Sequence, residues 1–358
     1  MRIIVTGGAG FIGSAMCRYL VGTGGATVLN IDKLTYAANL NSLDAIAGHC
    51  QYQFRQADIC DRADMELAVT AFQPNAVVHL AAESHVDRSI SGSDAFISSN
   101  IVGTYTLLQV ARAYWSSLTR EAADRFRFLH VSTDEVYGSL AEGLFSERSP
   151  YAPSSPYSAS KAASNHLVAA WHRTWGLPTL ICNCSNNYGP YQNPEKLIPR
   201  MIISALDGKP LPLYGDGMNV RDWLHVDDHV RALDTILRRG RPGDIFNVGG
   251  LNEQTNIAVV ERICALVDRR RPANAPHRRL ITYIDDRLGH DRRYAIDASK
   301  VTSELGWRPQ RDFAMGIEST VDWYLDNTGW WKPMTNPSPR RANGALEAGE
   351  EKEAGLKT

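Results

Sequence analysis

Short runs of consecutive apolar residues recur through the first part of the chain, each followed by a polar or glycine-containing segment. They read "RIIVTG" (2–7), "ATVLNID" (26–32), "AVVHLAA" (76–82) and "FRFLHVST" (126–133). Runs that are apolar throughout, rather than alternating with polar residues, are typical of parallel strands that helices cover on both faces. Because helical patterns separate the runs, the sequence predicts an α/β fold with a doubly wound parallel sheet.

The character of the sequence changes near residue 185, where Asn, Pro, Gly and aromatic residues become frequent. We therefore predict a cofactor-binding domain over 1–184 and a smaller, mainly α/β substrate-binding lobe over 185–331. A strand pattern at 244–248 and a helix pattern at 255–268 indicate that the chain crosses back to the first domain, at about 220–250.

Two charged segments carry no periodic pattern of apolar residues. The last stretch, 332–358, is rich in Pro, Gly and charged residues and is predicted to be a disordered tail. The basic segment "RRRPANAPHRR" (269–279) is predicted to be a solvated loop between a helix and a strand rather than a binding patch.

Composition narrows the classes of partner. The chain has 358 residues, 44% hydrophobic and 22% charged, with a formal net charge of −1. Nothing global therefore attracts nucleic acid or an anionic membrane, and local groups must bind any charged ligand. The six cysteines show neither Cys-x-x-Cys nor paired-His spacing, which predicts reduced thiols and no metal site. No signal-peptide pattern or membrane-length apolar run is present, so we expect a cytoplasmic protein.

A glycine-rich turn, "VTGGAGFIGSAM" (5–16), joins the first predicted strand to the first predicted helix. A tight turn, a bare backbone near a pyrophosphate and a close helix–strand contact each require glycine, and the helix N-terminus attracts phosphate. The position directly after the first strand strengthens this pattern as a dinucleotide-binding motif. The glycines concerned are Gly7, Gly8, Gly10 and Gly13.

Two acidic residues at strand ends are candidates for contacts with the adenosine half of the cofactor. Asp32 lies nineteen residues beyond Gly13, where a carboxylate can bind both ribose hydroxyls and repel a 2′-phosphate. We therefore expect NAD rather than NADP, although an acid at this position could instead only cap a turn. Asp58 follows the third strand and could face the adenine.

The segment "SSPYSASKAASNHL" (154–167) predicts a helix, because serines and then Pro156 form a favourable N-terminus. Tyr157 and Lys161 then lie four residues apart on one face of this helix. An ammonium beside a phenol lowers the pKa of the phenol, so Tyr157 could take a proton from a substrate hydroxyl as hydride leaves. Thr133 could hydrogen-bond the same substrate oxygen. Such a pair also occurs by chance, and the glycine turn upstream favours the catalytic interpretation.

With these motifs the chain resembles the extended short-chain dehydrogenases/reductases and, more narrowly, the dTDP-glucose 4,6-dehydratase family. The narrower resemblance extends over about 330 residues. Its motifs are "AAESHVDRSI" (81–90), "STDEVYG" (132–138), "PYSASKAASNHLV" (156–168), "SNNYGPYQNPEKLIP" (185–199), "NVRDWLHVDDH" (219–229) and "DDRLGHDRRYAID" (285–297). In the last of these, Leu288 replaces an expected proline, which bears on the rigidity of that loop rather than on the chemistry.

The resemblance implies two sets of binding residues. NAD contacts are implied at Phe11, Ile12, Asp32, Lys33, Thr35, Asp58, Ile59, Ala82, Tyr157, Lys161 and Asn187. Sugar-nucleotide contacts are implied at Ser84, Thr133, Asn186, Lys196, Leu197, Tyr214, Arg221, Asn256, Arg287 and His290. Arg221 and Lys196 also make physical sense alone, because a diphosphate bound to a near-neutral protein needs local cations, although each could instead form a surface ion pair.

The adjacent acids Asp134 and Glu135 separate a dehydratase from an epimerase. Oxidation of the sugar at C-4 acidifies the C-5 proton, so one group can remove that proton while another protonates the departing C-6 hydroxyl. The resemblance implies that Glu135 is the base and Asp134 the acid, and that hydride then returns to C-6. Because neighbouring residues in a strand point to opposite faces, the backbone must leave strand geometry by residue 134.

Other functions remain open from the residues alone. A sugar-nucleotide 4-epimerase, a dehydratase of another NDP-hexose and a non-catalytic NAD-binding protein share the cofactor motif. The thymidine base and the glucose stereochemistry rest on the resemblance. We expect a homodimer, because relatives of this fold usually pair through two helices and the helical segments 94–118 and 156–175 flank the sheet.

Overall fold

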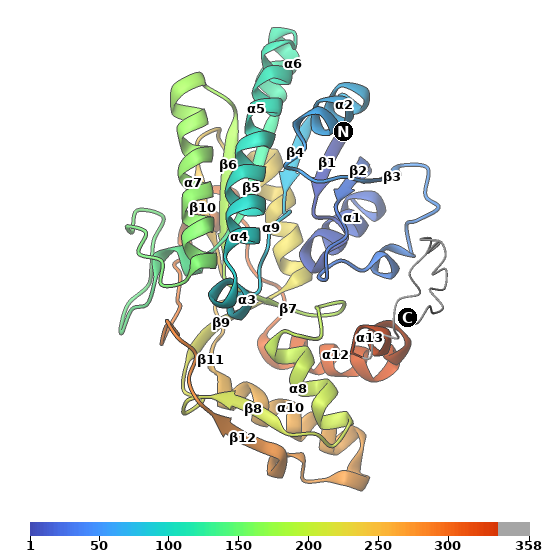
Figure 1. The fold of residues 1–358 in the computed structure, drawn as a ribbon, viewed down its shortest axis with the longest axis vertical. Coiled ribbons are helices and arrows are strands. Elements are labelled where there is room, and N and C mark those ends of the chain that lie inside the picture. The colour runs from blue at the N-terminus through green and yellow to red at the C-terminus, as the bar shows by residue number, and fades with distance from the viewer. Residues whose placement is uncertain (336–358) are drawn as a thin grey trace, which may run out of the picture.

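Seven parallel strands form the central sheet of the computed structural model, which describes residues 1–335 (Figure 1), and they confirm the predicted fold class. The sheet order is β10-β6-β5-β4-β1-β2-β3. The strands are β1 (Arg2–Thr6), β2 (Thr27–Asp32), β3 (Tyr52–Gln56), β4 (Ala76–His79), β5 (Arg127–Thr133), β6 (Thr179–Cys184) and β10 (Ile245–Val248). The strand order reverses between β1 and β4, and the carboxyl ends of the strands at such a reversal form a crevice that binds ligands.

Helices cover both faces of this sheet, which explains why most of its strands are largely apolar, whereas the edge strand β3 is more polar and exposed. Alternate residues of one strand enter different cores: Val78 packs with one set of helices and Val77 with the other. The first set is α1 (Phe11–Gly22), α9 (Val226–Arg239) and α11 (Ser299–Leu305). The second set is α2 (Arg62–Phe72), α5 (Gly103–Ser116) and α7 (Pro156–Trp175).

The chain between β4 and β5 is helical but not one regular helix. It contains α3 (Val86–Ser91), α4 (Asp94–Phe96), a π-helical stretch (Ile97–Val102), α5 and α6 (Arg120–Arg125). The predicted helical segment 94–118 therefore contains a π-helical interruption, which the spacing of its apolar residues did not indicate.

Within residues 186–335 a second core packs below the carboxyl edge of the large sheet (Figure 1). Two small sheets contribute to it, one ordered β11-β9-β7 and one pairing β12 with β8. Their strands are β7 (Asn186–Tyr188), β8 (Leu211–Tyr214), β9 (Val220–His225), β11 (Glu253–Thr255) and β12 (Ile281–Ile284). The helices are α8 (Leu197–Leu206), α10 (Asn256–Arg270), α12 (Phe313–Asp326) and α13 (Thr328–Thr335). The predicted domain boundaries stay predictions.

Two predictions for charged segments have different outcomes. Of the predicted loop 269–279, residues 271–279 lie between α10 and β12 and contain only short 3₁₀ turns. The prediction was wrong for Arg269 and Arg270, which end α10, and His277 is buried rather than solvated. The predicted tail was wrong for 332–335, which continue α13 because Trp330 and Trp331 are buried and the Trp331 indole donates to the Tyr324 carbonyl oxygen. The rest of that segment lies outside the described residues.

Candidate active site

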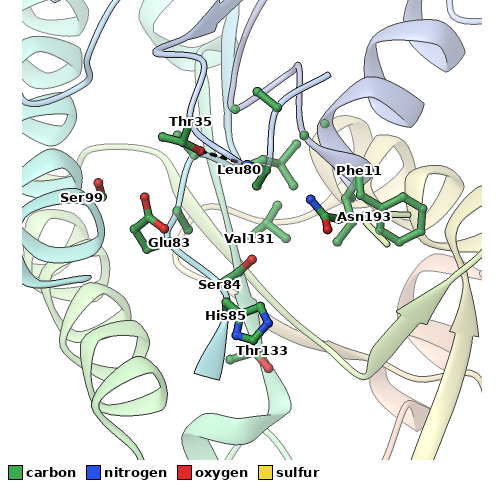
Figure 2. A pocket seen from close by; sticks show the side chains of 18 of the residues that line it. Phe11, Thr35, Leu80, Glu83, Ser84, His85, Ser99, Val131, Thr133 and Asn193 are labelled. Atoms are coloured by element: carbon green, nitrogen blue, oxygen red, sulfur yellow. Dashed lines mark hydrogen bonds between the residues drawn. The ribbon is translucent and has the colours of Figure 1, made fainter. Parts of the chain in front are cut away.

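A cavity lies at the strand-order reversal, between the glycine turn and the second core (Figure 2). Fifteen predicted cofactor and catalytic residues line it: Gly7, Gly10, Phe11, Ile12, Gly13, Asp32, Lys33, Thr35, Ile59, Ala82, Thr133, Glu135, Tyr157, Lys161 and Asn187. The predicted substrate contacts Ser84, Asn186 and Lys196 line it too. Residues that are far apart in sequence therefore share one site.

The turn before α1 fits a dinucleotide phosphate. Gly7 has a φ of +73°, and a Cβ there would come within 2.6 Å of the Ala81 backbone nitrogen. A Cβ on Gly13 would collide with the Gly7 carbonyl oxygen. No side chain caps the N-terminus of α1, and its first turn contains no acidic residue. Its N–H groups and positive dipole end are therefore available to an anion.

Asp32 is held rigidly at the end of β2. One carboxylate oxygen accepts from the Ala9 amide at 2.9 Å, and the other accepts from the Leu34 amide at 2.8 Å. The carboxylate thus anchors the glycine turn while it lines the cavity. Asp58 does not line the cavity: it accepts from the Cys60 amide and lies 3.7 Å from the Lys33 ammonium.

Helix α7 begins as predicted. Ser155 and Ser158 form a reciprocal capping box, and Pro156 occupies the first turn. This start brings Tyr157 and Lys161 into the cavity wall, where both are buried. The Lys161 ammonium donates to the Val131 carbonyl oxygen at 2.8 Å, and burial lowers the pKa of Lys161 to about 8.

The prediction that Lys161 lowers the pKa of Tyr157 was wrong: in the field of the protein's own side chains this pKa is raised. Burial raises the pKa of Tyr157 well above its ordinary value, and the negative charge of Glu135 adds to this shift. A hydrogen bond with Thr133 acts in the opposite direction but does not offset burial. Tyr157 is therefore a neutral phenol in this environment.

The two acids follow β5 directly, and the backbone leaves strand geometry where predicted. β5 ends at Thr133, and a 3₁₀ turn, Asp134–Tyr137, begins at the next residue. The Thr133 hydroxyl accepts from the Glu135 amide and donates to the Asp134 carboxylate, both at 3.3 Å. Glu135 lines the cavity, whereas Asp134 does not and is only 1% exposed.

Asp134 is a buried acid whose surroundings favour the protonated carboxyl. Burial raises the pKa of its carboxyl well above the ordinary value, and the negative charges of Glu135 and Asp222 add to this shift. Its Oδ2 atom makes no hydrogen bond within residues 1–335. A carboxyl that stays protonated near neutral pH can act as a general acid.

Glu135 is half-buried and lies among cations. Burial raises its pKa, and three positive side chains oppose that shift: Arg287, Arg221 and Lys196. These cations come from three separate segments of the second lobe, so the fold gathers them around one carboxylate. A group that is buried and also near opposite charge can remain ionised and act as a base.

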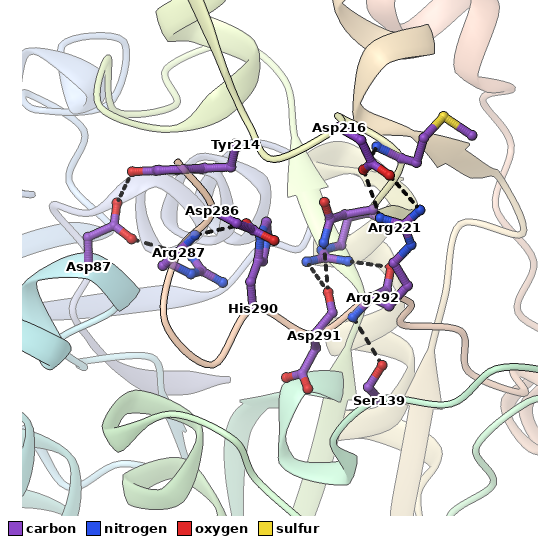
Figure 3. A network of polar contacts seen from close by, with 12 residues as sticks. Asp87, Ser139, Tyr214, Asp216, Arg221, Asp286, Arg287, His290, Asp291 and Arg292 are labelled. Atoms are coloured by element: carbon purple, nitrogen blue, oxygen red, sulfur yellow. Dashed lines mark hydrogen bonds and ion pairs between the residues drawn. The ribbon is translucent and has the colours of Figure 1, made fainter. Parts of the chain in front are cut away.

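Six predicted substrate contacts do not line the cavity: Leu197, Tyr214, Arg221, Asn256, Arg287 and His290. Four of these belong to the polar network in Figure 3. The Arg221 guanidinium donates to the Asp291 carbonyl oxygen at 2.9 Å, and the His290 ring lies 2.6 Å from Asp286. Leu197 begins α8 and packs against the second core.

Some buried polar atoms of the predicted substrate contacts have no hydrogen-bond partner within residues 1–335. Among the buried side-chain atoms of the described residues that make no hydrogen bond, three belong to this set: Asn186 Oδ1, Asn256 Oδ1 and Arg287 Nε. Buried polar groups are normally paired, and a buried group without a partner in the protein can bind a ligand or an ordered water. All three belong to predicted substrate contacts, so their environment fits a polar ligand.

Sequence reasoning missed several residues of the cavity wall, among them Glu83, His85 and Cys184. Glu83 is held by Asn100, which bonds both its backbone amide and its carbonyl oxygen. The motif "AAESHVDRSI" could have drawn attention to Glu83 and His85, because it follows β4 at the ligand-binding edge.

Neither a metal site nor a membrane-spanning helix is found within residues 1–335. In this range no cluster of three or more His, Cys, Asp or Glu side chains has the arrangement of a metal site. None of the helices in the same range combines the length and apolar character needed to span a bilayer.

Comparison with known proteins identifies the family. The model of the GDP-mannose 4,6 dehydratase family matches residues 4–320. The chain is 61% identical to a probable dTDP-glucose 4,6-dehydratase from Sinorhizobium fredii, over 93% of this chain and 95% of that protein. It is 56% identical to dTDP-glucose 4,6-dehydratase from Neisseria meningitidis, over 95% and 97%.

A solved structure agrees with these sequence matches. The fold superposes on dTDP-glucose 4,6-dehydratase from Streptomyces venezuelae, solved with NAD bound, with a TM-score of 0.86. The two chains are 44% identical, and the match covers 93% of this chain and all of the other. The chain therefore belongs to the dTDP-glucose 4,6-dehydratase family.

Proposed function

We propose that the protein removes water from dTDP-glucose to give dTDP-4-keto-6-deoxyglucose, with NAD as a cofactor that is regenerated in each turnover. The observation that carries this proposal is the acid pair after β5, with Glu135 in the cavity beside Tyr157 and Thr133. The proposal includes the roles of the individual site residues. The names of the relatives support dTDP-glucose as the substrate.

NAD, when bound, would accept the hydride, and its oxidised ring would carry a positive charge. The protein's own groups act on the C-4 hydroxyl: Thr133 orients it, and Tyr157 takes its proton. Burial raises the pKa of Tyr157, so nearby positive charge is needed to stabilise the phenolate. Lys161 adds to that charge when it is protonated, which its pKa of about 8 permits at neutral pH.

Glu135 then removes the C-5 proton, which the C-4 ketone has made acidic. The raised pKa of Glu135 strengthens it as a base, while Arg287, Arg221 and Lys196 keep it ionised. Asp134 gives its proton to the departing C-6 hydroxyl. To reach the sugar it must turn from its buried position, and the 3.3 Å contact with Thr133 is long for an O–H···O bond and restrains it only weakly.

Product mass and NADH absorbance together test this function. We would incubate the protein and NAD with dTDP-glucose, UDP-glucose and GDP-glucose in parallel. We expect one water to be lost from dTDP-glucose without accumulation of NADH. An isomer of unchanged mass would instead indicate a 4-epimerase, and preferential reaction of UDP- or GDP-glucose would contradict the proposed base.

The glycine turn gives a prediction for cofactor affinity. Gly13→Ala should weaken NAD binding at least about tenfold, because the added Cβ collides with the Gly7 carbonyl oxygen and displaces the turn. Gly22→Ala in the same helix is a matched control, because no atom lies within 4 Å of its added Cβ. Titration of NAD measures both variants. Equal affinity in Gly13→Ala and the control would contradict a phosphate site at this turn.

We also propose a homodimer that pairs through the outer face of α5, α7 and the preceding π-helical stretch. The support is a set of exposed apolar side chains: Ile97 and Val102 are each 46% exposed, and Tyr105 and Trp175 are each 43% exposed. Tyr105 packs edge-on against Trp171, which contacts Trp175, so the aromatic surface is continuous across both helices. Continuous exposed apolar patches are typical of protein interfaces.

Light scattering tests the dimer. The wild-type protein should have about twice the 39.6 kDa mass of one chain, and Val102→Glu should shift it toward monomer. Met315→Glu is the control, because Met315 is 68% exposed on α12, away from this face. A monomeric wild type, or a Val102→Glu variant that stays dimeric, would contradict the proposal.

A cytoplasmic location is proposed as well. Within the described residues, which include all six cysteines, every cysteine is a free thiol, and this suits a reducing compartment.

A further inference from the structure

Asp87 connects the two lobes at a point that the proposed mechanism leaves unexplained. It lies in the first turn of α3, which belongs to the lobe that contains the large sheet. Its carboxylate nevertheless contacts the second lobe: the Tyr214 hydroxyl donates to Oδ2 at 3.2 Å, and the Arg287 guanidinium lies 3.5 Å from Oδ1 (Figure 3). Both partners are among the predicted sugar-nucleotide contacts.

The contacts of Asp87 are incomplete. Its Oδ1 atom and the Nε of Arg287 are both shielded from solvent, and neither makes a hydrogen bond within residues 1–335. A guanidinium that binds a carboxylate strongly usually does so through two parallel hydrogen bonds at shorter distances. The pairing is therefore loose, and the guanidinium keeps donors for a further anion.

The lobes do not depend on Asp87 for their connection. Arg88 of the same helix donates to Glu195 at 2.6 Å, and the Lys196 ammonium donates to the Ser84 carbonyl oxygen at 2.7 Å. Two direct contacts, one from α3 and one from the segment before it, thus reach the second lobe on either side of Asp87. A purely structural role for its carboxylate is redundant.

We propose that Asp87 is an internal counter-ion of the nucleotide site: it holds Tyr214 and Arg287 in place, and the diphosphate of the substrate competes with it for them. This inference rests on the proposed function, because it takes Tyr214 and Arg287 as nucleotide contacts. A phenol hydroxyl donates one hydrogen bond, so Tyr214 cannot donate to Asp87 and to a phosphate together. The carboxylate also repels an approaching phosphate. Asp87 therefore sets an upper limit on nucleotide affinity.

Calorimetric titration with dTDP tests the inference. Asp87→Asn keeps the shape of the side chain and an oxygen that can accept from Tyr214 but removes the charge. Its affinity for dTDP should rise about two- to fivefold, the range expected for removal of a partly exposed ion pair. The KM for dTDP-glucose should fall by a similar factor, without a rise in kcat. Asp124→Asn, an exposed position on α6, controls for the loss of one negative charge.

The same substitution made in a protein that lacks Arg287 makes the test specific to the Asp87–Arg287 pair. In an Arg287→Met protein, the further change Asp87→Asn should alter dTDP affinity by less than it does in the wild type. Equal or weaker dTDP binding by Asp87→Asn, or the same gain in the Asp124→Asn control, overturns the counter-ion role while leaving the proposed function intact. Failure of dTDP to bind the wild-type protein overturns the proposed function and this inference together.

Discussion

Glu135→Gln should reduce the rate of water loss from dTDP-glucose by about 10²–10⁴-fold, the usual contribution of a general base. Glutamine preserves the volume of the side chain but cannot take the C-5 proton. Oxidation at C-4 does not need Glu135, so NADH should accumulate when substrate is added to the variant with NAD bound. Stopped-flow absorbance and product mass measure the two effects in one sample.

The accumulation of NADH makes this result diagnostic. A variant that is merely misfolded would show neither NADH nor product. Glu66→Gln, an exposed residue of α2 that pairs with Arg62, should behave like the wild type. Water loss at the wild-type rate in Glu135→Gln would exclude Glu135 as the base at C-5.

Tyr157→Phe should give the opposite signature. Removal of the phenol leaves no group to take the C-4 hydroxyl proton, so oxidation itself should slow by about 10²–10⁴-fold and NADH should not accumulate. NAD affinity should change little, since the glycine turn and Asp32 remain. The same absorbance measurement, made in a single turnover, distinguishes this variant from Glu135→Gln.

The order of the two steps predicts the behaviour of the double variant. Because oxidation comes first, Tyr157→Phe combined with Glu135→Gln should resemble Tyr157→Phe alone. Accumulation of NADH by Tyr157→Phe, or by the double variant, would show that another group takes the C-4 hydroxyl proton.

Local patterns predicted the elements that position the site. The apolar runs gave the strands, and Ser155 with Pro156 gave the start of α7, because strand burial and helix capping depend on residues close in sequence. The departure from strand geometry after Thr133 also followed from a local argument, namely that two adjacent side chains must reach one ligand.

Properties that depend on distant segments could not be predicted in this way. The pKa of Tyr157 was mispredicted because burial, which the sequence does not state, raises it, and the negative charge of Glu135 adds to the rise. The contact of Asp87 with Tyr214 joins residues 127 positions apart, and no periodic pattern connects them. Residues 332–335 were mispredicted because their composition is typical of a disordered tail. In the structure they continue α13, and the buried side chains of Trp330 and Trp331 anchor that helix to the second core.

Transfer of one hydride from C-4 to C-6 is the step that defines the proposed reaction, and a labelled substrate can follow it. We would react dTDP-glucose that carries deuterium at C-4 with the wild-type protein and locate the label in the product by NMR and mass spectrometry. We expect a product that is lighter by one water and carries deuterium at C-6. Deuterium that remains at C-4, or that is lost to solvent, would contradict it.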